Sequence, residues 1–253
     1  MRKKLLTIIG FLLWTLSGSA QQYIGSEGLI HVPTADMDTV GIARVGAHYI
    51  PKAMMPDRML LDGEKFNSWT NYLSVTPFRW IELGYGYTLW KMHKNLNKKN
   101  EVGFYSKDRY FSVRLQLLQE GRWWPAVAVG GNDVWGSSDN GVSASNYYRN
   151  YYASLSKHID VKGHEFGAHV TYRKWKQDFN RKWNGVVGGL TYRPAFYRPL
   201  RLVGEWDGCG VNVGADCRLF KYFLVQCALL DFSDFNAGLC LYIPLYKPHI
   251  TKQ

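Results

Sequence analysis

The sequence predicts an all-β protein: an antiparallel outer-membrane β-barrel of about 12 strands, preceded by an irregular N-terminal segment. Three observations predict it. The chain begins with an export signal, its later segments alternate apolar with polar or small residues, and the connections between them alternate long and short. Aromatic residues make up 15% of the chain and there are 25 glycines, a composition that favours strands over helices.

The first 20 residues are organised like a cleavable signal peptide. Arg2–Lys4 form a positive n-region, residues 5–16 form an apolar h-region, and small residues lead up to Ala20. The apolar run is shorter than the about 20 residues that a spanning helix needs, so we expect cleavage near Ala20, with a retained N-terminal anchor as the alternative. Gln21 rather than Cys follows, which argues against a lipoprotein.

The expected domains are a signal peptide over residues 1–20, an irregular N-terminal segment over 21–42 and a β-barrel over 43–253. The expected strands span residues 43–50, 68–76, 79–89, 107–118, 123–134, 146–156, 163–172, 185–193, 200–207, 210–218, 222–231 and 235–245. An even number of strands is usual for a bacterial outer-membrane barrel.

Alternation is clearest in four of these segments, residues 79–89, 107–118, 163–172 and 210–218. In a membrane barrel the apolar face meets lipid and the polar or small face lines the lumen. A soluble β-sandwich alternates too, so this pattern alone leaves both architectures open.

Connection length favours the barrel. The expected long connections are 51–67, 90–106, 135–145 and 173–184, and the short ones between them are 77–78, 119–122, 157–162 and 194–199. Outer-membrane barrels place short turns in the periplasm and long loops outside, whereas a sandwich has no reason to keep this phase.

Aromatic residues gather near the expected strand ends. They are Trp69, Phe78, Trp80, Trp90, Trp123, Trp124, Trp135, Trp175, Trp183, Phe196, Tyr197, Phe220 and Tyr222. Rings at the level of the lipid headgroups explain this placement, and platforms that stack on sugars are the alternative.

Charge and cysteine content limit the partners. The net charge is +11, and loss of three basic residues with the signal leaves about +8, spread thinly. For an exported protein we expect lipid or lipopolysaccharide headgroups or acidic glycans as partners, and no nucleic acid. Cys209, Cys217, Cys227 and Cys240 are either small apolar strand residues or disulfide partners, with Cys227 opposite Cys240 as the pair to test.

No catalytic or metal motif stands out in the sequence. The seven histidines are scattered without metal-ligand spacing, and no local grouping of Ser, His and an acid suggests the lipase chemistry that some barrels carry. We therefore expect no enzyme activity, no metal and no cofactor.

Polar residues on the expected lumen faces are the site candidates. They are Glu82, Arg114, Gln116, Glu165, His169, Glu205, Asp207, Asp216 and Arg218. They either line a polar path or cavity for a glycan, or pair with one another and fill a narrow barrel.

The run from Gly28 to Met37, GLIHVPTADM, followed by Gly41, resembles the N-terminal signature of the YjbH-type exopolysaccharide-associated outer-membrane proteins. The motif residues are Gly28, Leu29, Ile30, Pro33, Thr34, Ala35 and Gly41. The likeness continues in residues 72–88, around the Pro-Phe-Arg-Trp-Ile-Glu turn, and in shorter runs as far as Asp207. This chain resembles a short, single-barrel member without a lipobox cysteine.

The resemblance implies an outer-membrane barrel that takes part in exopolysaccharide or capsule assembly, export or surface retention in a Gram-negative bacterium. Its expected partners are polysaccharide and polysaccharide-export proteins. The alternatives are a scaffold barrel with a filled lumen and a secreted glycan-binding β-protein. Residues 25–37, rich in Gly and Pro, either plug the periplasmic mouth or simply lead into the first strand.

Overall fold

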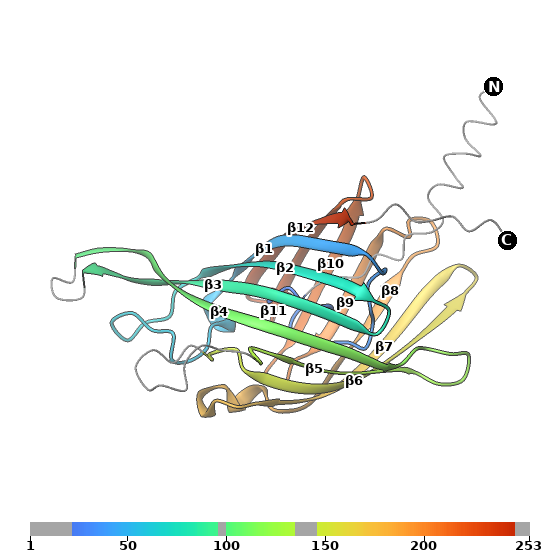
Figure 1. Cartoon of the computed structure of the whole chain (residues 1–253), viewed down its shortest axis with the longest axis horizontal. Helices are drawn as coiled ribbons and strands as arrows, with labels where there is room; N and C mark the ends of the chain where they lie inside the picture. The colour runs from blue at the N-terminus through green and yellow to red at the C-terminus, as the bar shows by residue number, and fades with distance from the viewer. Residues whose placement is uncertain (1–21, 96–99, 135–145, 246–253) are drawn as a thin grey trace, which may run out of the picture.

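The computed structural model describes residues 22–95, 100–134 and 146–245, and these form a closed antiparallel barrel (Figure 1). Its twelve strands are β1 (Ile42–Ile50), β2 (Ser68–Phe78), β3 (Ile81–Asn95), β4 (Asn100–Leu118), β5 (Ala126–Asn132), β6 (Asn150–Val161), β7 (His164–Trp175), β8 (Gly185–Arg193), β9 (Leu200–Trp206), β10 (Val211–Leu219), β11 (Phe223–Leu230) and β12 (Asp234–Pro244). The predicted fold class and strand number are thus confirmed. The expected signal peptide lies outside the described residues.

Each strand pairs with its neighbours in sequence, and β1 closes the barrel on β12 from Ile42–Pro244 to Tyr49–Ala237. Closure leaves no unpaired strand edge, which is what allows strands to cross a membrane.

One predicted connection is wrong. Residues 90–106 were expected to form a long loop, but β3 continues to Asn95 and β4 resumes at Asn100, so that the two extend beyond the other strands (Figure 1). The polar composition of this stretch hides its strand character. Pairing between the two strands, as at Met92–Gly103 and His93–Val102, supplies what local pattern does not.

The expected alternation of short and long connections holds only in part, because the connections 51–67, 133–149 and 176–184 are long whereas those after β3, β9 and β11 are short. Short turns at residues 79–80, 119–125, 162–163, 194–199 and 220–222 lie at one end, which we call the short-turn end. The opposite, long-loop end carries two 3-10 helices, η1 (Lys52–Met54) and η2 (Asp178–Trp183). Among the described residues, no helix has both the length and the apolar character needed to span a membrane.

Burial along the strands is inverted relative to a soluble protein. In β7, for example, Phe166 and Val170 are about half exposed while His169, Thr171 and Arg173 are buried. The predicted apolar faces therefore point outward and the polar faces inward, as an outer-membrane barrel requires.

Most of the predicted rim aromatics are exposed, and eight of them gather at the short-turn end. These eight are Phe78, Trp80, Trp123, Trp124, Phe196, Tyr197, Phe220 and Tyr222. Two others were misplaced by the sequence reading: Trp175 and Trp183 are each only 3% exposed. They pack against His31 inside the barrel, so they belong neither to a girdle nor to a sugar platform. Trp135 lies outside the described residues.

The proposed pairing of Cys227 with Cys240 is also wrong. The β11–β12 register places Cys227 opposite Ala237 and Cys240 opposite Leu224. Cys227 is exposed on the outer face while Cys240 is buried on the inner face, because the two positions have opposite parity along the paired strands. All four cysteines are free.

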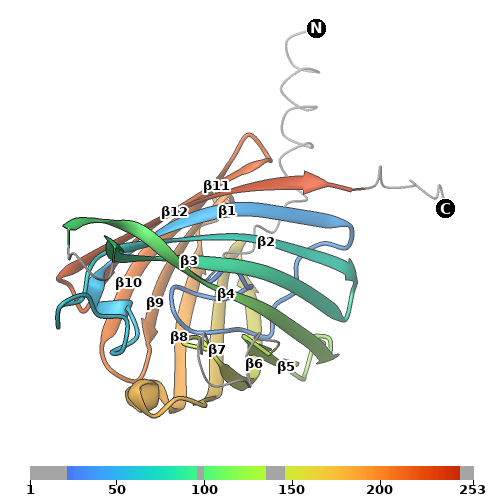
Figure 2. The same cartoon turned by 60° about the vertical axis from the view of Figure 1, so that its left-hand side comes forward.

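Residues 22–41, which we call the lumen segment, are mostly buried within the strands, with Thr39 and Val40 exposed near its end, and appear in Figure 2 as the blue trace inside the barrel. Its apolar side chains Tyr23, Leu29, Ile30 and Val32 are at most 1% exposed. Gly41, at φ +76°, turns the chain from this segment into β1, a conformation that favours glycine. The hypothesis that the segment plugs the barrel is therefore supported, and the plug reaches into the lumen rather than covering only its mouth.

Candidate functional site in the barrel lumen

The lumen segment folds into a tight hairpin at the family-like motif. Gly28 and Pro33 form an isolated antiparallel bridge, and the Leu29 amide donates to the Val32 carbonyl at 2.9 Å. Gly28 is required here because a Cβ atom would lie 2.6 Å from the Val32 carbonyl oxygen. The tip of this hairpin points its amides outward, toward the barrel wall.

Glu205 on β9 receives those amides. Its carboxylate accepts hydrogen bonds from the amides of Ile30 at 3.0 Å, His31 at 2.8 Å and Val32 at 3.2 Å. Asn212 donates to the same carboxylate at 2.8 Å. A buried carboxyl group that accepts several hydrogen bonds at once is a strong anchor, since each of these amides would otherwise be an unsatisfied buried donor.

His31 is held on every side. Its Nδ1 lies 2.9 Å from the Asp207 carboxylate, and its ring meets the ring of Trp183 edge-on, with centroids 5.1 Å apart. Arg173 on β7 donates to the His31 carbonyl at 2.8 Å and to the Asp207 carbonyl at 3.1 Å. The motif histidine is thus fixed by packing and hydrogen bonds, with no free face toward solvent.

A second cluster joins the lumen segment to β1, β3 and β4. Glu27 on the segment forms an ion pair with Arg44, which also contacts Glu82 at 3.1 Å. Glu82 in turn accepts the Glu27 amide at 3.1 Å. Arg114 on β4 donates to the Glu27 and Asp36 carbonyls, the latter at 2.7 Å. Charges of both signs therefore offset one another in the middle of the barrel, as buried charges must.

Further inner-face residues complete the contacts. Gln116 donates to the Ala35 carbonyl at 2.8 Å. Arg201 pairs with Asp216 at 2.9 Å and donates to the Gly28 carbonyl at 3.1 Å. The polar side chains of the wall thus satisfy the backbone of a segment that has little regular structure of its own.

The nine predicted site residues therefore divide into groups. Glu82, Arg114, Gln116 and Glu205 bind the lumen segment directly, Asp207 binds it through His31, and Asp216 supports it through Arg201.

The remaining three lie elsewhere. Arg218 stacks on Tyr242, with its guanidinium 3.9 Å from the ring centroid. Glu165 pairs with Arg193 and Arg198 near the short-turn end. His169 belongs to a separate cluster described below. None of these placements tests a glycan path, which stays a prediction.

Sequence reasoning missed three arginines that matter most in this arrangement: Arg44, Arg173 and Arg201. All three are at most 3% exposed and each contacts the lumen segment. For Arg44 and Arg201 the available signal was their inward parity within predicted strands, whereas Arg173 fell in a segment predicted to be a loop and lies in β7, which continues to Trp175.

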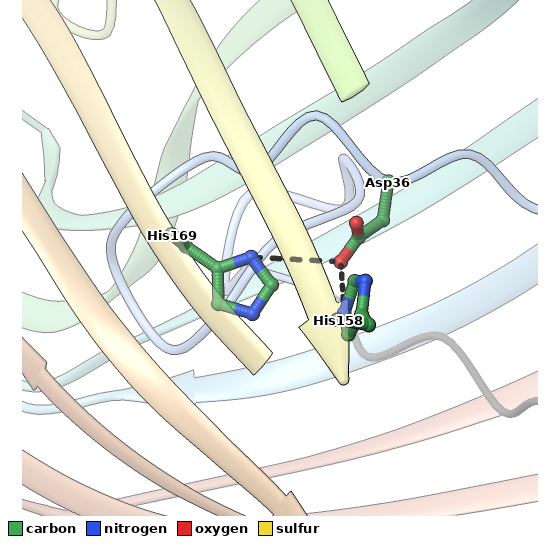
Figure 3. Close-up of side chains that lie close together, drawn as sticks. All are labelled: Asp36, His158 and His169. Atoms are coloured by element: carbon green, nitrogen blue, oxygen red, sulfur yellow. Dashed lines mark ion pairs between the residues drawn. The ribbon is translucent and has the colours of Figure 1, made fainter. Parts of the chain in front are cut away.

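A cavity of about 430 Å³ opens at the short-turn end. It is lined by Asp36, Met37, Gln116, Glu120, Ala126, His158, Glu165, Thr191, Arg193 and Arg201. At its inner wall Asp36, His158 and His169 lie together, with the Asp36 carboxylate between the two imidazoles (Figure 3). The carboxylate oxygen Oδ2 is 3.8 Å from His158 Nε2 and 3.8 Å from His169 Nδ1.

Glu120, in the turn between β4 and β5, supports this group from the outside. It accepts hydrogen bonds from His158 at 2.8 Å and from Lys157 at 2.9 Å. Burial alone would raise the pKa of the Glu120 carboxyl, but these hydrogen bonds outweigh it and lower the pKa below its usual value. Glu120 is therefore a carboxylate at neutral pH.

Ser156 also contacts His169, its Oγ lying 2.9 Å from Nδ1. The tertiary structure thus unites a Ser, a His and an acid that the sequence does not place together. In a Ser-His-Asp triad, however, the serine and the acid contact opposite nitrogens of the imidazole. Here both face Nδ1, while Nε2 lies 3.2 Å from Thr191, and Ser156 itself is fully buried. This is not the geometry of a nucleophilic triad.

Comparison with solved structures finds barrels of outer-membrane phospholipases. Outer membrane phospholipase A from Escherichia coli is 11% identical, at a TM-score of 0.36, covering 82% of this chain and 98% of that one. The Salmonella typhi outer membrane phospholipase, a dimer with bound calcium, is 10% identical at a TM-score of 0.36, covering 82% and 92%.

These neighbours contradict the sequence-based prediction that the chain is not an enzyme, because both are enzymes on a barrel. Such a likeness concerns the fold and assigns no activity to this chain.

None of the curated proteins compared with the chain matches it. The sequence profile of one family, described as exopolysaccharide biosynthesis protein YbjH, matches residues 20–157. This match covers the lumen segment and its motif, together with the arginines and acids of the Glu27 cluster. It also covers the strands from β1 to Lys157 in β6. The chain therefore belongs to the YjbH family of exopolysaccharide biosynthesis proteins.

Proposed function

We propose that this protein is an outer-membrane barrel that serves exopolysaccharide assembly or surface retention with its lumen closed by its own N-terminal segment. Family membership supports the link to exopolysaccharide, and the barrel with its apolar outer face supports the place in the membrane. Its expected contacts are outer-membrane lipid and lipopolysaccharide, polysaccharide, and polysaccharide-export proteins at the two ends.

The filled lumen is the observation that carries this proposal. Most of the inner-face acids and arginines that could have lined a glycan path are engaged with the lumen segment, as Glu205 is with residues 30–32 and Arg114 with Glu27. A polysaccharide chain passing through the barrel would first have to displace this segment and leave those buried charges without partners. Loss of one partner of a buried ion pair typically costs about 3–5 kcal/mol.

Conductance of the purified protein in planar lipid bilayers tests the closed state. We expect no steady ion conductance from the mature wild-type chain, and open channels when residues 22–38 are deleted. A matched deletion of the same length is not available inside the barrel, so removal of the exposed loop residues 62–64 serves as the control and should stay closed. Steady wild-type conductance would refute the proposal.

Surface polysaccharide tests the biological role. Deletion of the gene should reduce cell-bound exopolysaccharide, and the wild-type gene should restore it. Under this proposal, a strain that carries the channel-forming 22–38 deletion variant does not produce more cell-bound exopolysaccharide than the wild type. Unchanged exopolysaccharide in the deletion strain would overturn the link, whatever the conductance shows.

A further inference from the structure

We propose that Asp36, His158 and His169 form a binding site for a divalent transition-metal ion of the zinc class at the short-turn end of the lumen (Figure 3). The three side chains come from three elements: Asp36 from the lumen segment, His158 from β6 and His169 from β7. Neither the family match nor the proposed function assigns a metal to this chain.

The distances fit shared ligation better than direct pairing. Asp36 Oδ2 lies 3.8 Å from the facing nitrogen of each histidine, which is too long for a hydrogen bond. Zinc binds nitrogen and oxygen at about 2.0–2.2 Å, so two ligand atoms of a tetrahedral ion lie about 3.4 Å apart. All three ligand atoms here are within 4.8 Å of one another. A side-chain movement of well under 1 Å therefore brings them to one ion.

In both histidine rings, the nitrogen that points away from Asp36 already has a hydrogen-bond partner. His158 Nδ1 lies 2.8 Å from Glu120 Oε2, and His169 Nε2 lies 3.2 Å from Thr191 Oγ1. Metal-bound histidines almost always donate their other N–H to such an oxygen, which fixes the ring and its tautomer. These two contacts leave His158 Nε2 and His169 Nδ1 as the nitrogens that face Asp36.

The strand register explains why the rings meet. His158 on β6 is paired with Gly167 on β7, so His169, two residues farther along β7, lies diagonally across on the same inner face. Gly167 leaves the space that they use, because a Cβ atom there would lie 2.8 Å from His158 Cδ2 and 2.9 Å from His169 Nε2. The ring centroids are consequently 5.3 Å apart.

The surrounding charges permit a cation. Arg193 and Arg201 line the same cavity, but they pair with Glu165 at 3.0 Å and with Asp216 at 2.9 Å. Ser156 Oγ is the one competitor for the His169 nitrogen, at 2.9 Å. The Ala35 amide donates to this oxygen, so the hydroxyl group keeps a partner when its proton turns away from His169.

The ligand set selects the kind of metal. Two imidazoles and one carboxylate suit zinc and its first-row neighbours, whereas calcium and magnesium prefer oxygen ligands alone. Three protein ligands leave at least one coordination position for water, and here that position faces the cavity because His158 and Asp36 line it. Since Asp36 belongs to the lumen segment, a bound ion would tie that segment to the wall.

Titration of the mature, folded chain in detergent micelles with Zn²⁺ by calorimetry, and with Co²⁺ by visible absorption, tests the site. We expect one ion per chain and a Co²⁺ spectrum typical of nitrogen and oxygen ligands in four- or five-fold coordination. Asp36→Asn and His169→Gln should abolish saturable binding. Glu120→Gln, which changes the partner of His158 without removing a metal ligand, should weaken binding about 10- to 100-fold.

His164→Gln is the matched control. His164 is a histidine near the same end whose Nδ1 contacts Tyr192 rather than the cluster, so its loss should leave the affinity unchanged. Heat-modifiable migration on a detergent gel verifies that each variant is folded. If His169→Gln does not fold, the test of the metal site rests on the affinity of Asp36→Asn alone. No saturable binding by the wild type, or equal affinity in Asp36→Asn, would overturn the proposal.

Discussion

At the scale of single residues, the inner-face side chains of this barrel provide hydrogen-bond partners for the backbone of the lumen segment, which forms few hydrogen bonds within itself. Residues 27–35 make few hydrogen bonds with one another, yet they are buried in the lumen. Glu205 compensates by accepting three consecutive amides, and Arg114 by donating to two carbonyls. Each such side chain stabilises the segment by removing an otherwise unsatisfied buried group, each worth about 1–3 kcal/mol.

Replacing Glu205 with Gln should loosen the hairpin of the lumen segment without opening the barrel. The amide NH₂ of Gln cannot accept the hydrogen bonds that one carboxylate oxygen now receives, so about 1–3 kcal/mol of local stability is lost. We expect the amides of residues 30–32 to exchange about 10- to 100-fold faster in hydrogen–deuterium exchange mass spectrometry. Glu64→Gln, in an exposed loop, should leave them unchanged, and equal rates in both variants would contradict the role of Glu205.

At the scale of elements, the lumen segment and the strands are fitted to each other by small residues on the inner face. Gly189 on β8 is one such position: a Cβ atom there would lie 2.6 Å from Leu29 Cδ1 and 2.5 Å from the Gly204 carbonyl oxygen. Gly204, on the neighbouring strand β9, has open space where its own Cβ atom would be. The sequence does not distinguish the two glycines, but an added methyl group would clash at Gly189 and would fit at Gly204.

Gly189→Ala should therefore destabilise the folded barrel, because it forces Leu29 or the wall to move, and overpacking of this kind costs about 1–3 kcal/mol. Gly204→Ala should be neutral or slightly stabilising, since it removes freedom from the unfolded chain without a clash. The temperature at which the heat-modifiable band disappears on a detergent gel measures both. A fall of equal size in the two variants would show that contact with the lumen segment is not the cause.

The fold at this scale was largely predictable from the sequence. Nine of the twelve expected strands required only small changes of boundary, because alternation and turn residues are local signals. The ribbon formed by β3 and β4 was not foreseen, since its residues near Asn95 and Asn100 lack an apolar alternation. The lumen site was predictable only in part. The positions of Glu82 and Arg114 in their alternating strands predict that their side chains face the lumen, but not which residues they contact.

At the scale of the whole molecule, the barrel reverses the usual arrangement of a soluble protein, with apolar side chains outside and many polar side chains inside. Large apolar side chains such as Val170 and Leu190 are more than half exposed, while the interior holds arginines, acids and histidines. Such an arrangement is unfavourable in water, where a large exposed apolar surface associates with other surfaces. It is favourable in a bilayer, where hydrocarbon covers the outer face and the filled lumen contains the charges.

Val170→Arg places a charge at the middle of the outer face of β7, at about the depth of the bilayer centre. We expect the free energy of folding into lipid vesicles to become less favourable by about 2–4 kcal/mol, as for other arginines at the midplane of outer-membrane barrels. Leu60→Arg, in the exposed loop between β1 and β2, is the control and should change it by less than about 0.5 kcal/mol. A similarly small effect for Val170→Arg would argue against lipid at this face.

The sequence by itself determined the number of strands, the face of most residues within them and the positions of three long loops. These properties depend on residues close together in the chain, through a period of two and the conformational preferences of turns. The motif from Gly28 to Met37 added the family likeness, which the profile match over residues 20–157 confirms.

Only the tertiary structure decided what fills the barrel and which side chains meet. Asp36 lies 122 positions from His158 in the chain, and Ile30 is 175 from Glu205, so no local pattern connects them. Their contacts arise because the closed sheet leaves a lumen of fixed width, and the unpaired backbone of residues 22–41 must find its hydrogen bonds on that wall. The two-residue turn between β6 and β7 sets the register that places His158 and His169 together, and the enclosed segment brings Asp36 to them.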